Sequence, residues 1–371
     1  MNSKTQKRAA ILVALIVTAS LRLLAQATTP PPQTFSTTIY FDYSFNATNN
    51  GYLTGTDAAK ALDNKFAFRR AYFTYENKIN DDLKFRFRVD ADNTANITSI
   101  DFTKSTIKKD DKLRPFMKHL YLDWAGLLPN SSLKIGMVET QAFKVAEDRW
   151  GYRSVAKTIV DGYKDITGVD IRTSSADIGV NLTGSVNKYL RYGAMVMNGE
   201  GYSRPELNKY KKFGAYLQFV PVAGLNFFGY TETERLSDSA AAQLYKVDMY
   251  FDMVPSLNVS GEYFTYNSDN NFDKVAQPDG STVNNHYNVG GFSIFGTYKI
   301  IIDKLNVFAR FDSYTPDSTN DLKNMVLVII GLDWAPVHSS WKIQPNVWFY
   351  NYKDSAKKSD VVANLTFFLS F

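Results

Sequence analysis

From Leu83 to Asp92 the chain reads LKFRFRVDAD, in which apolar and charged residues alternate without interruption. Successive side chains of a β-strand point to opposite faces, so the apolar residues share one face and the charged residues the other. A helix would scatter the same residues around its axis. The charged face carries Lys84, Arg86, Arg88, Asp90 and Asp92. The stretch therefore predicts a strand that separates an apolar medium from water.

The same alternation recurs along the chain, for example from Phe35 to Phe45 and from Trp341 to Tyr350. It explains how aromatic residues reach 15% while the mean hydropathy stays at −0.26. We expect sixteen strands, which begin near Phe35, Lys65, Leu83, Pro115, Ser132, Asp177, Tyr189, Lys211, Gly224, Gln243, Leu257, Asn288, Lys304, Lys323, Ser340 and Asp360. Seven short turns alternate with eight longer loops between these strands. This asymmetry predicts an all-β fold, a transmembrane antiparallel β-barrel with both termini in the periplasm.

The first 27 residues have the organisation of a secretory signal peptide. Lys4, Lys7 and Arg8 precede an apolar stretch, and an Ala-Gln-Ala cleavage site ends at Ala27. Residues 28–34 are expected to form a proline-rich leader, and residues 35–371 a single barrel. Removal of residues 1–27 lowers the formal charge from +5 to +1, which argues against nucleic-acid binding. The chain has no cysteine, which excludes a disulfide framework and a thiolate metal site.

The C-terminal segment alternates from Val361 to Phe371, an aromatic residue in the last position. A barrel in lipid must close its last strand against its first, because an open edge leaves backbone groups without partners. This tail resembles the C-terminal signature of outer-membrane proteins, so Phe371 is the expected signal for the barrel assembly machinery. We expect the protein in the outer membrane of a diderm bacterium, in contact with outer-membrane lipids and lipopolysaccharide.

The connection formed by residues 142–176 is about three times longer than most others. Loops of this length are usually functional or disordered, and the aromatic and apolar content here argues against disorder. Among its basic residues, Arg149, Arg153 and Lys157 would line a constriction if the loop folds into the barrel. A cap outside the pore is the alternative. Residues 168–173 also alternate, but a further strand would break the order of turns and loops, so we assign them to this loop.

Six cationic residues on expected inward faces mark a candidate anion pathway: Lys84, Arg86, Arg88, Lys134, Arg191 and Arg310. Alternate residues on a strand are about 6–7 Å apart, so the cations between residues 84 and 88 would pass an anion from one to the next. The alternative is an ordinary wet wall of both signs. In that wall the neutralising carboxylates would be Asp90, Asp92, Asp123 and Asp312.

Signs of enzyme chemistry are weak. The three histidines, His119, His286 and His338, lack metal-ligand spacing, and no Ser-His-acid arrangement stands out. We therefore expect no catalytic residue, no metal and no cofactor. A passive porin for small hydrophilic solutes is the first hypothesis. The alternatives are an outer-membrane barrel enzyme such as a lipid hydrolase, and a soluble exported β-sandwich that acts as a binding module.

Several short segments together resemble the phosphate-selective porin O and P family. They are residues 68–71, 121–124, 133–137, 177–184, 196–201 and 309–312, which occur in the order of the family's own segments. The resemblance implies a sixteen-stranded barrel, usually a homotrimer, with inward loops and a basic lumen that passes phosphate or other anions. The mature charge of +1 departs from that pattern, as do Asp90 and Asp92 at the end of the basic stripe. The resemblance therefore supports the barrel architecture more strongly than it supports phosphate selectivity.

Overall fold

The computed structural model describes residues 32–48, 64–93, 96–101, 106–110, 112–163, 167–206 and 208–371. The expected signal peptide and the start of the expected leader lie outside these residues, so both remain predictions. The first strand begins at Gln33, inside the segment 28–34 that we expected to be a leader.

Sixteen antiparallel strands close into one barrel, which confirms the predicted fold class and strand number. The barrel strands are β1 (Gln33–Thr48), β2 (Asn64–Lys78), β3 (Leu83–Asn93), β6 (Leu113–Ala125), β7 (Ser131–Glu139), β8 (Ala176–Ser185), β9 (Leu190–Met197), β10 (Lys212–Val222), β11 (Leu225–Arg235), β12 (Ala241–Val254), β13 (Leu257–Ser268), β16 (Val289–Ile301), β17 (Leu305–Thr315), β18 (Met325–Trp334), β19 (Trp341–Tyr352) and β20 (Asp360–Ser370). Each strand pairs with its neighbours in chain order, so every connection joins adjacent strands.

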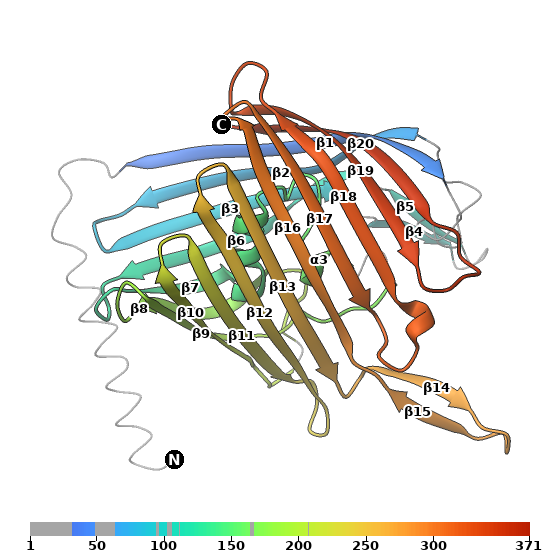
Figure 1. The fold of residues 1–371 in the computed structure, drawn as a ribbon. Helices are drawn as coiled ribbons and strands as arrows, with labels where there is room; N and C mark the ends of the chain where they lie inside the picture. The colour runs from blue at the N-terminus through green and yellow to red at the C-terminus, as the bar shows by residue number, and fades with distance from the viewer. Residues whose placement is uncertain are drawn as a thin grey trace, which may run out of the picture.

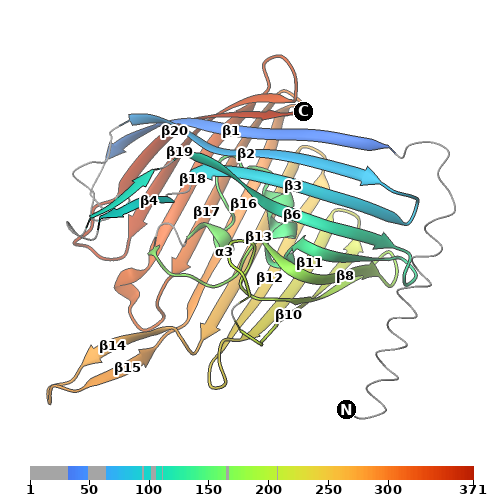
Figure 2. The ribbon, with the colours of Figure 1, turned by 180° about the vertical axis from the view of Figure 1, so that it is seen from behind.

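Two further hairpins lie outside the barrel wall. They are β4 (Asn96–Asp101) with β5 (Thr106–Asp110), and β14 (Phe272–Ala276) with β15 (Thr282–His286). Both project from the end of the barrel opposite to the C-terminus (Figures 1 and 2). That end carries the longer connections, and the other end carries the short turns, as the sequence predicts.

The barrel closes where β20 pairs with β1, from Ser370 opposite Thr38 to Val361 opposite Thr48. Phe371 continues this pairing, because its backbone N–H and carbonyl both bond to Thr37, at 3.0 and 2.6 Å. The Phe371 ring is 70% exposed, so its backbone, and not its side chain, takes part in the closure. Sheet closure satisfies the backbone groups that an edge would leave open.

The two faces of the wall differ as the alternation predicts. On β12 the side chains of Lys246 and Asp248 are buried inside the barrel, while Tyr245, Val247 and Met249 are 45–60% exposed on the outside. Exposed apolar side chains continue around the other strands. A continuous apolar band of this kind suits a lipid environment and not water. Among the described residues, no helix is long and apolar enough to cross a membrane.

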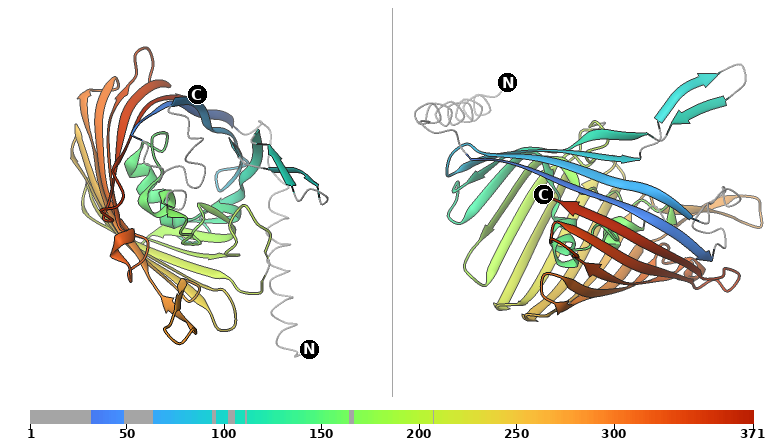
Figure 3. Two further views of the ribbon diagram at one scale, coloured as in Figure 1. Left: turned by 90° about the vertical axis from the view of Figure 1, so that its right-hand side faces the viewer. Right: turned by 90° about the horizontal axis from the view of Figure 1, so that it is seen from above.

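In the described part of the connection from β7 to β8, the structure has the helices α2 (Gln141–Trp150) and α3 (Ile159–Gly162). Seen along the barrel in the left view of Figure 3, these green helices lie within the ring of strands. Residues 168–173, the segment that we assigned to this loop, form no regular element. We call residues 140–175 the inward loop.

Candidate pore constriction

Aromatic packing holds the inward loop against one side of the barrel. Trp150 is 1% exposed and meets the rings of Phe295 and Phe308 edge-on, at 5.5 and 5.8 Å between centroids. Tyr163 stacks on Tyr314 of β17 at 4.2 Å. Edge-to-face and stacked pairs at these distances add stability beyond the area that they bury. The loop is therefore a packed part of the interior and not a cap outside the pore.

Polar anchors fix the middle of the loop to the wall. The Arg69 guanidinium on β2 donates to the backbone carbonyls of Ser154 and Val155. Across the barrel seam, the Ser154 hydroxyl donates to Gln344 on β19 at 2.6 Å. The Tyr163 hydroxyl donates to Asp312 on β17 at 2.9 Å. These bonds satisfy loop groups that would otherwise be buried without partners.

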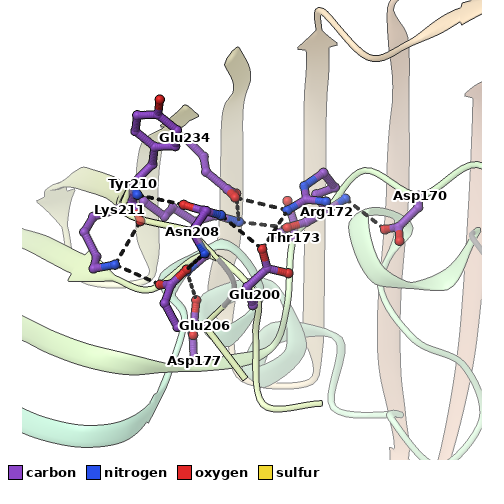
Figure 4. Close-up of polar contacts among 12 residues, drawn as sticks. Asp170, Arg172, Thr173, Asp177, Glu200, Glu206, Asn208, Tyr210, Lys211 and Glu234 are labelled. Atoms are coloured by element: carbon purple, nitrogen blue, oxygen red, sulfur yellow. Dashed lines mark hydrogen bonds and ion pairs between the residues drawn. The ribbon is translucent and has the colours of Figure 1, made fainter. Parts of the chain in front are cut away.

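The exit of the loop is held by a group of charges near the outer end of β10 and β11 (Figure 4). Arg172 has a left-handed φ of 50°, and its N–H donates to the Asp170 carboxylate at 2.9 Å. Its guanidinium donates to Glu234 at 3.2 Å and lies 3.6 Å from Glu200. The Lys212 ammonium donates to the Arg172 carbonyl at 2.8 Å. Because several bonds hold it, Arg172 keeps a backbone conformation that a non-glycine residue rarely adopts.

Open space remains between the loop and the opposite part of the wall. A cavity of about 650 Å³ separates the loop from β1 and β2, and its basic lining is Lys65, Arg69, Arg70, Arg153, Lys157 and Arg310. Its acidic lining is Asp42 and Asp92. A second cavity of about 280 Å³ lies between β3, β6 and α2. Arg153 of the loop lines both cavities, so the loop and the wall formed by β1, β2, β3 and β6 together bound the narrow part of the lumen.

The structure places the three predicted cations of β3, Lys84, Arg86 and Arg88, on the inner face. Their surroundings differ from one residue to the next. Lys84 and Arg86 line a third cavity, of about 400 Å³, near the short turns. Arg86 lies 3.2 Å from Glu76 and 3.6 Å from Glu139. Arg88 donates to the Thr74 hydroxyl at 2.7 Å.

The carboxylates that were expected to neutralise these three cations interact with other residues. Asp90 and Asp92 both pair with Arg70 of β2, at 2.6 and 3.3 Å, and not with Arg86 or Arg88. Asp123 accepts a hydrogen bond from the Ser132 hydroxyl.

The other three predicted wall cations are in different situations. Lys134 pairs with Glu139 at 3.3 Å. Arg310 is 3% exposed and pairs with Asp312 at 2.6 Å, while it also donates to the Lys157 carbonyl. Arg191 is exposed near the short-turn end of β9, on the strand face that carries Met195 and Met197. Arg310 is thus part of the packed interior, whereas Lys134 and Arg191 lie nearer to open space.

The predicted cations of the loop are all paired. Arg149 pairs with Asp252, at the short-turn end of β12. Arg153 lies 3.0 Å from Glu147 and 3.2 Å from Asp161, and Lys157 lies 3.8 Å from Asp161. Burial raises the pKa of the Glu147 carboxyl, although the Arg153 charge opposes this shift. Burial also acts on Asp161, but Arg153 and Lys157 outweigh it and hold that pKa below its usual value.

Two β-bulges add lumen cations that the alternation did not predict. On β2, Tyr40 faces Arg70 while Phe41 faces Phe68, so Arg69 is an extra residue. On β6, Arg88 faces His119 while Val89 faces Met117, so Lys118 is an extra residue. A bulge puts two consecutive side chains on one face. Arg69 with Arg70, and Lys118 with His119, therefore all line the lumen cavities.

The sequence does contain a signal for the second bulge. The outward apolar residues of β6 are Met117, Leu120, Leu122 and Trp124, each 36–42% exposed. The step of three between Met117 and Leu120 breaks the period of two, and this break marks the bulge. Strict alternation from His119 through Tyr121 and Asp123 would place Lys118 on the lipid face, whereas the bulge brings it to the inner face beside His119.

The histidines form no evident catalytic group. His119 is 4% exposed, and its Nδ1 lies 3.8 Å from Glu139. His286 ends the β15 hairpin, and His338 lies in the turn before β19. Within the described parts of the chain, no group of three His, Cys, Asp or Glu side chains is placed to hold a metal ion.

Comparison with known proteins gives a likeness of fold. No protein-family model matches the chain, and no curated protein matches it by sequence. The trimer form of OmpT, an outer membrane protein of Vibrio cholerae, is 12% identical with a TM-score of 0.58, over 92% of this chain and 100% of that chain.

Two further solved structures share the fold. The outer membrane channel DcaP of Acinetobacter baumannii is 12% identical with a TM-score of 0.59, over 93% of this chain and 99% of that chain. An anion-selective porin from Comamonas acidovorans is 10% identical with a TM-score of 0.58, over 92% and 99%. The chain therefore has the barrel fold of outer-membrane porins and channels, whereas membership of the phosphate-selective porin family remains a prediction.

Proposed function

We propose that this protein is an outer-membrane porin through which small hydrophilic solutes diffuse passively. One observation carries the proposal: a closed barrel with an apolar outside holds an inward loop, and a cavity of about 650 Å³ remains beside that loop. A water-filled passage through such a wall needs a polar inner face and a bounded width. The likeness to solved porins and channels supports the same function.

The pattern of ion pairs supports a lumen of mixed sign with a modest preference for anions. Arg86, Lys134 and Arg153 each have a carboxylate within 3.6 Å, so a continuous ladder of free cations is not favoured. The larger cavity nevertheless has more basic than acidic residues in its lining. We therefore favour a general porin over a phosphate-specific one.

Assembly and location form part of the same proposal. A homotrimer in the outer membrane is consistent with the trimer form of the Vibrio cholerae protein. Contact with lipopolysaccharide and insertion by the barrel assembly machinery follow from an outer-membrane location. Phe371 remains our candidate for the assembly signal.

Reconstitution in a planar bilayer tests the proposal. The purified full-length protein should give discrete current steps in potassium chloride, with a small reversal potential towards anions in a salt gradient. Raised salt should weaken this preference, because the Debye length falls to about 3 Å at 1 M. Extraction without detergent, or the absence of current steps from a heat-modifiable barrel, would contradict a porin.

A further inference from the structure

The cavity of about 280 Å³ between β3, β6 and α2, which we call the side pocket, has an uneven balance of charge. Its three carboxylates all have a cation nearby. Glu139 lies 3.3 Å from Lys134, and Glu147 lies 3.0 Å from Arg153. Asp148 pairs with Lys144. The acidic part of the lining is therefore already neutralised by the protein.

Two cations of the side pocket lack such a partner. Lys118 is 6% exposed, and its ammonium donates to the Ser175 hydroxyl at 2.7 Å and lies 3.6 Å from the centre of the Tyr202 ring. Arg88 donates from Nε to Thr74. Among the residues that the structure describes, no carboxylate oxygen lies within ion-pair distance of either side chain. A buried ammonium without a counter-charge is costly, so this arrangement favours an anion from outside.

The start of α2 adds to the positive potential. Thr140, the residue before the helix, lines the side pocket, but its hydroxyl donates to the Ser174 carbonyl and does not cap the helix. The first turn contains no acidic residue. The free N–H groups and the helix dipole of a ten-residue helix both favour a negative charge at this end. Lys118 and the helix start are independent observations that favour the same kind of ligand.

We propose that the side pocket binds the carboxylate of a small organic acid during its passage through the pore. The Lys118 ammonium offers its remaining donors, and the Arg88 guanidinium offers the planar fork that matches a carboxylate. Tyr72 and Phe143, which also line the pocket, provide ring surface for the hydrocarbon part. Phosphate is less well suited, because it has no hydrocarbon part to place against Tyr72 and Phe143. The assignment rests on the proposed porin function and names its solute class.

The first experiment needs no variant. Single-channel current through the wild-type protein is recorded at constant potassium concentration while acetate, inorganic phosphate or neutral acetamide is added. Acetate should reduce the current at a lower concentration than phosphate, and acetamide should have little effect. Tighter block by phosphate, or equal block by acetate and acetamide, would overturn the carboxylate assignment. Absence of current in potassium chloride alone would instead overturn the porin function.

The second experiment locates the site. Lys118→Gln and Arg88→Gln should each raise the half-blocking acetate concentration at least about tenfold, the usual effect of losing a charge-assisted hydrogen bond. Lys188→Gln removes the same charge from the β8–β9 turn, outside the lumen, and should leave the block unchanged. Heat-modifiable mobility and retained current in potassium chloride show that the variants are folded. Equal acetate block in the wild type and both lumen variants would overturn the site.

Discussion

Inward-facing charges have different surroundings in two parts of the barrel wall. In one part they are buried and paired with one another, and in the other they lie at the edges of cavities. On the packed wall, formed by β12, β13 and β17, Lys246 bridges Asp248 and Glu262, and all three side chains are at most 3% exposed. Helix α2 contacts this region. On the open wall, formed by β2, β3 and β6, bulges bring extra cations to the edges of cavities.

The difference shows that an inward strand face does not by itself define a pore. Where the loop covers the wall, inward charges must pair with one another, because water no longer solvates them. Where the loop leaves space, cations remain available to a solute.

The largest effect is expected on the packed wall. Lys246→Met should destabilise the folded barrel by about 3–5 kcal/mol, because it leaves two buried carboxylates without their shared cation. The loss would be measured as a lower free energy of unfolding in urea, with the protein in detergent micelles. Water cannot solvate the two carboxylates in place of the lysine, because all three side chains are buried.

Lys65→Met is the matched control for this change. Lys65 is exposed and lines the larger cavity of the open wall, so the same substitution there should alter the free energy of unfolding by only about 0.5 kcal/mol or less. Similar losses for the two variants would contradict the distinction between the two walls.

A medium effect is expected at the anchors of the inward loop. Arg69→Met removes the donor to the Ser154 and Val155 carbonyls, so that attachment should weaken by about 1.5–3 kcal/mol. The expected results are noisier single-channel current and faster amide hydrogen exchange in residues 151–158. Both changes should occur without loss of the barrel itself.

Arg149→Met serves as the comparison within the same loop. Its partner Asp252 and its own guanidinium are both about one third exposed, so the pair should contribute about 1 kcal/mol or less. If this variant loosens the loop as much as Arg69→Met, the anchors on the β2 side do not hold the constriction.

The barrel could be predicted from the sequence because its signal repeats. Alternation over each strand and the order of short turns and long loops gave the number of strands and their connections. This works because the lipid face and the water face impose a period of two on every strand. Arg86 and Lys134, for example, both lie within 3.6 Å of the Glu139 carboxylate.

The constriction could not be predicted in the same detail, for three physical reasons. Bulges shift the period by one residue, so Arg69 and Lys118 appear to face lipid when strict alternation is applied. Ion pairing also depends on which residues lie side by side on neighbouring strands. Asp90 of β3 pairs with Arg70 of β2, and this pair can be identified only when the register between the two strands is known. The apolar residues of the loop, such as Trp150, suit an inner wall or an outer cap equally well.

The smallest effect is expected from pH, at the point where the loop faces the open wall. Glu147 is the counter-charge of Arg153, and burial raises its pKa above the usual value of 4.5. On acidification this carboxyl therefore takes up a proton before ordinary glutamates do, while Asp161, with its lowered pKa, stays charged. One negative charge is lost from the constriction, so the reversal potential should move towards anions as the pH falls towards the ordinary glutamate range. The change should correspond to about 1 kcal/mol or less, because water and salt screen the lumen.

The variant Glu147→Gln tests this assignment. It should show the shifted preference for anions already at neutral pH and should lose the pH response. A pH response identical to that of the wild type would place the titrating group elsewhere.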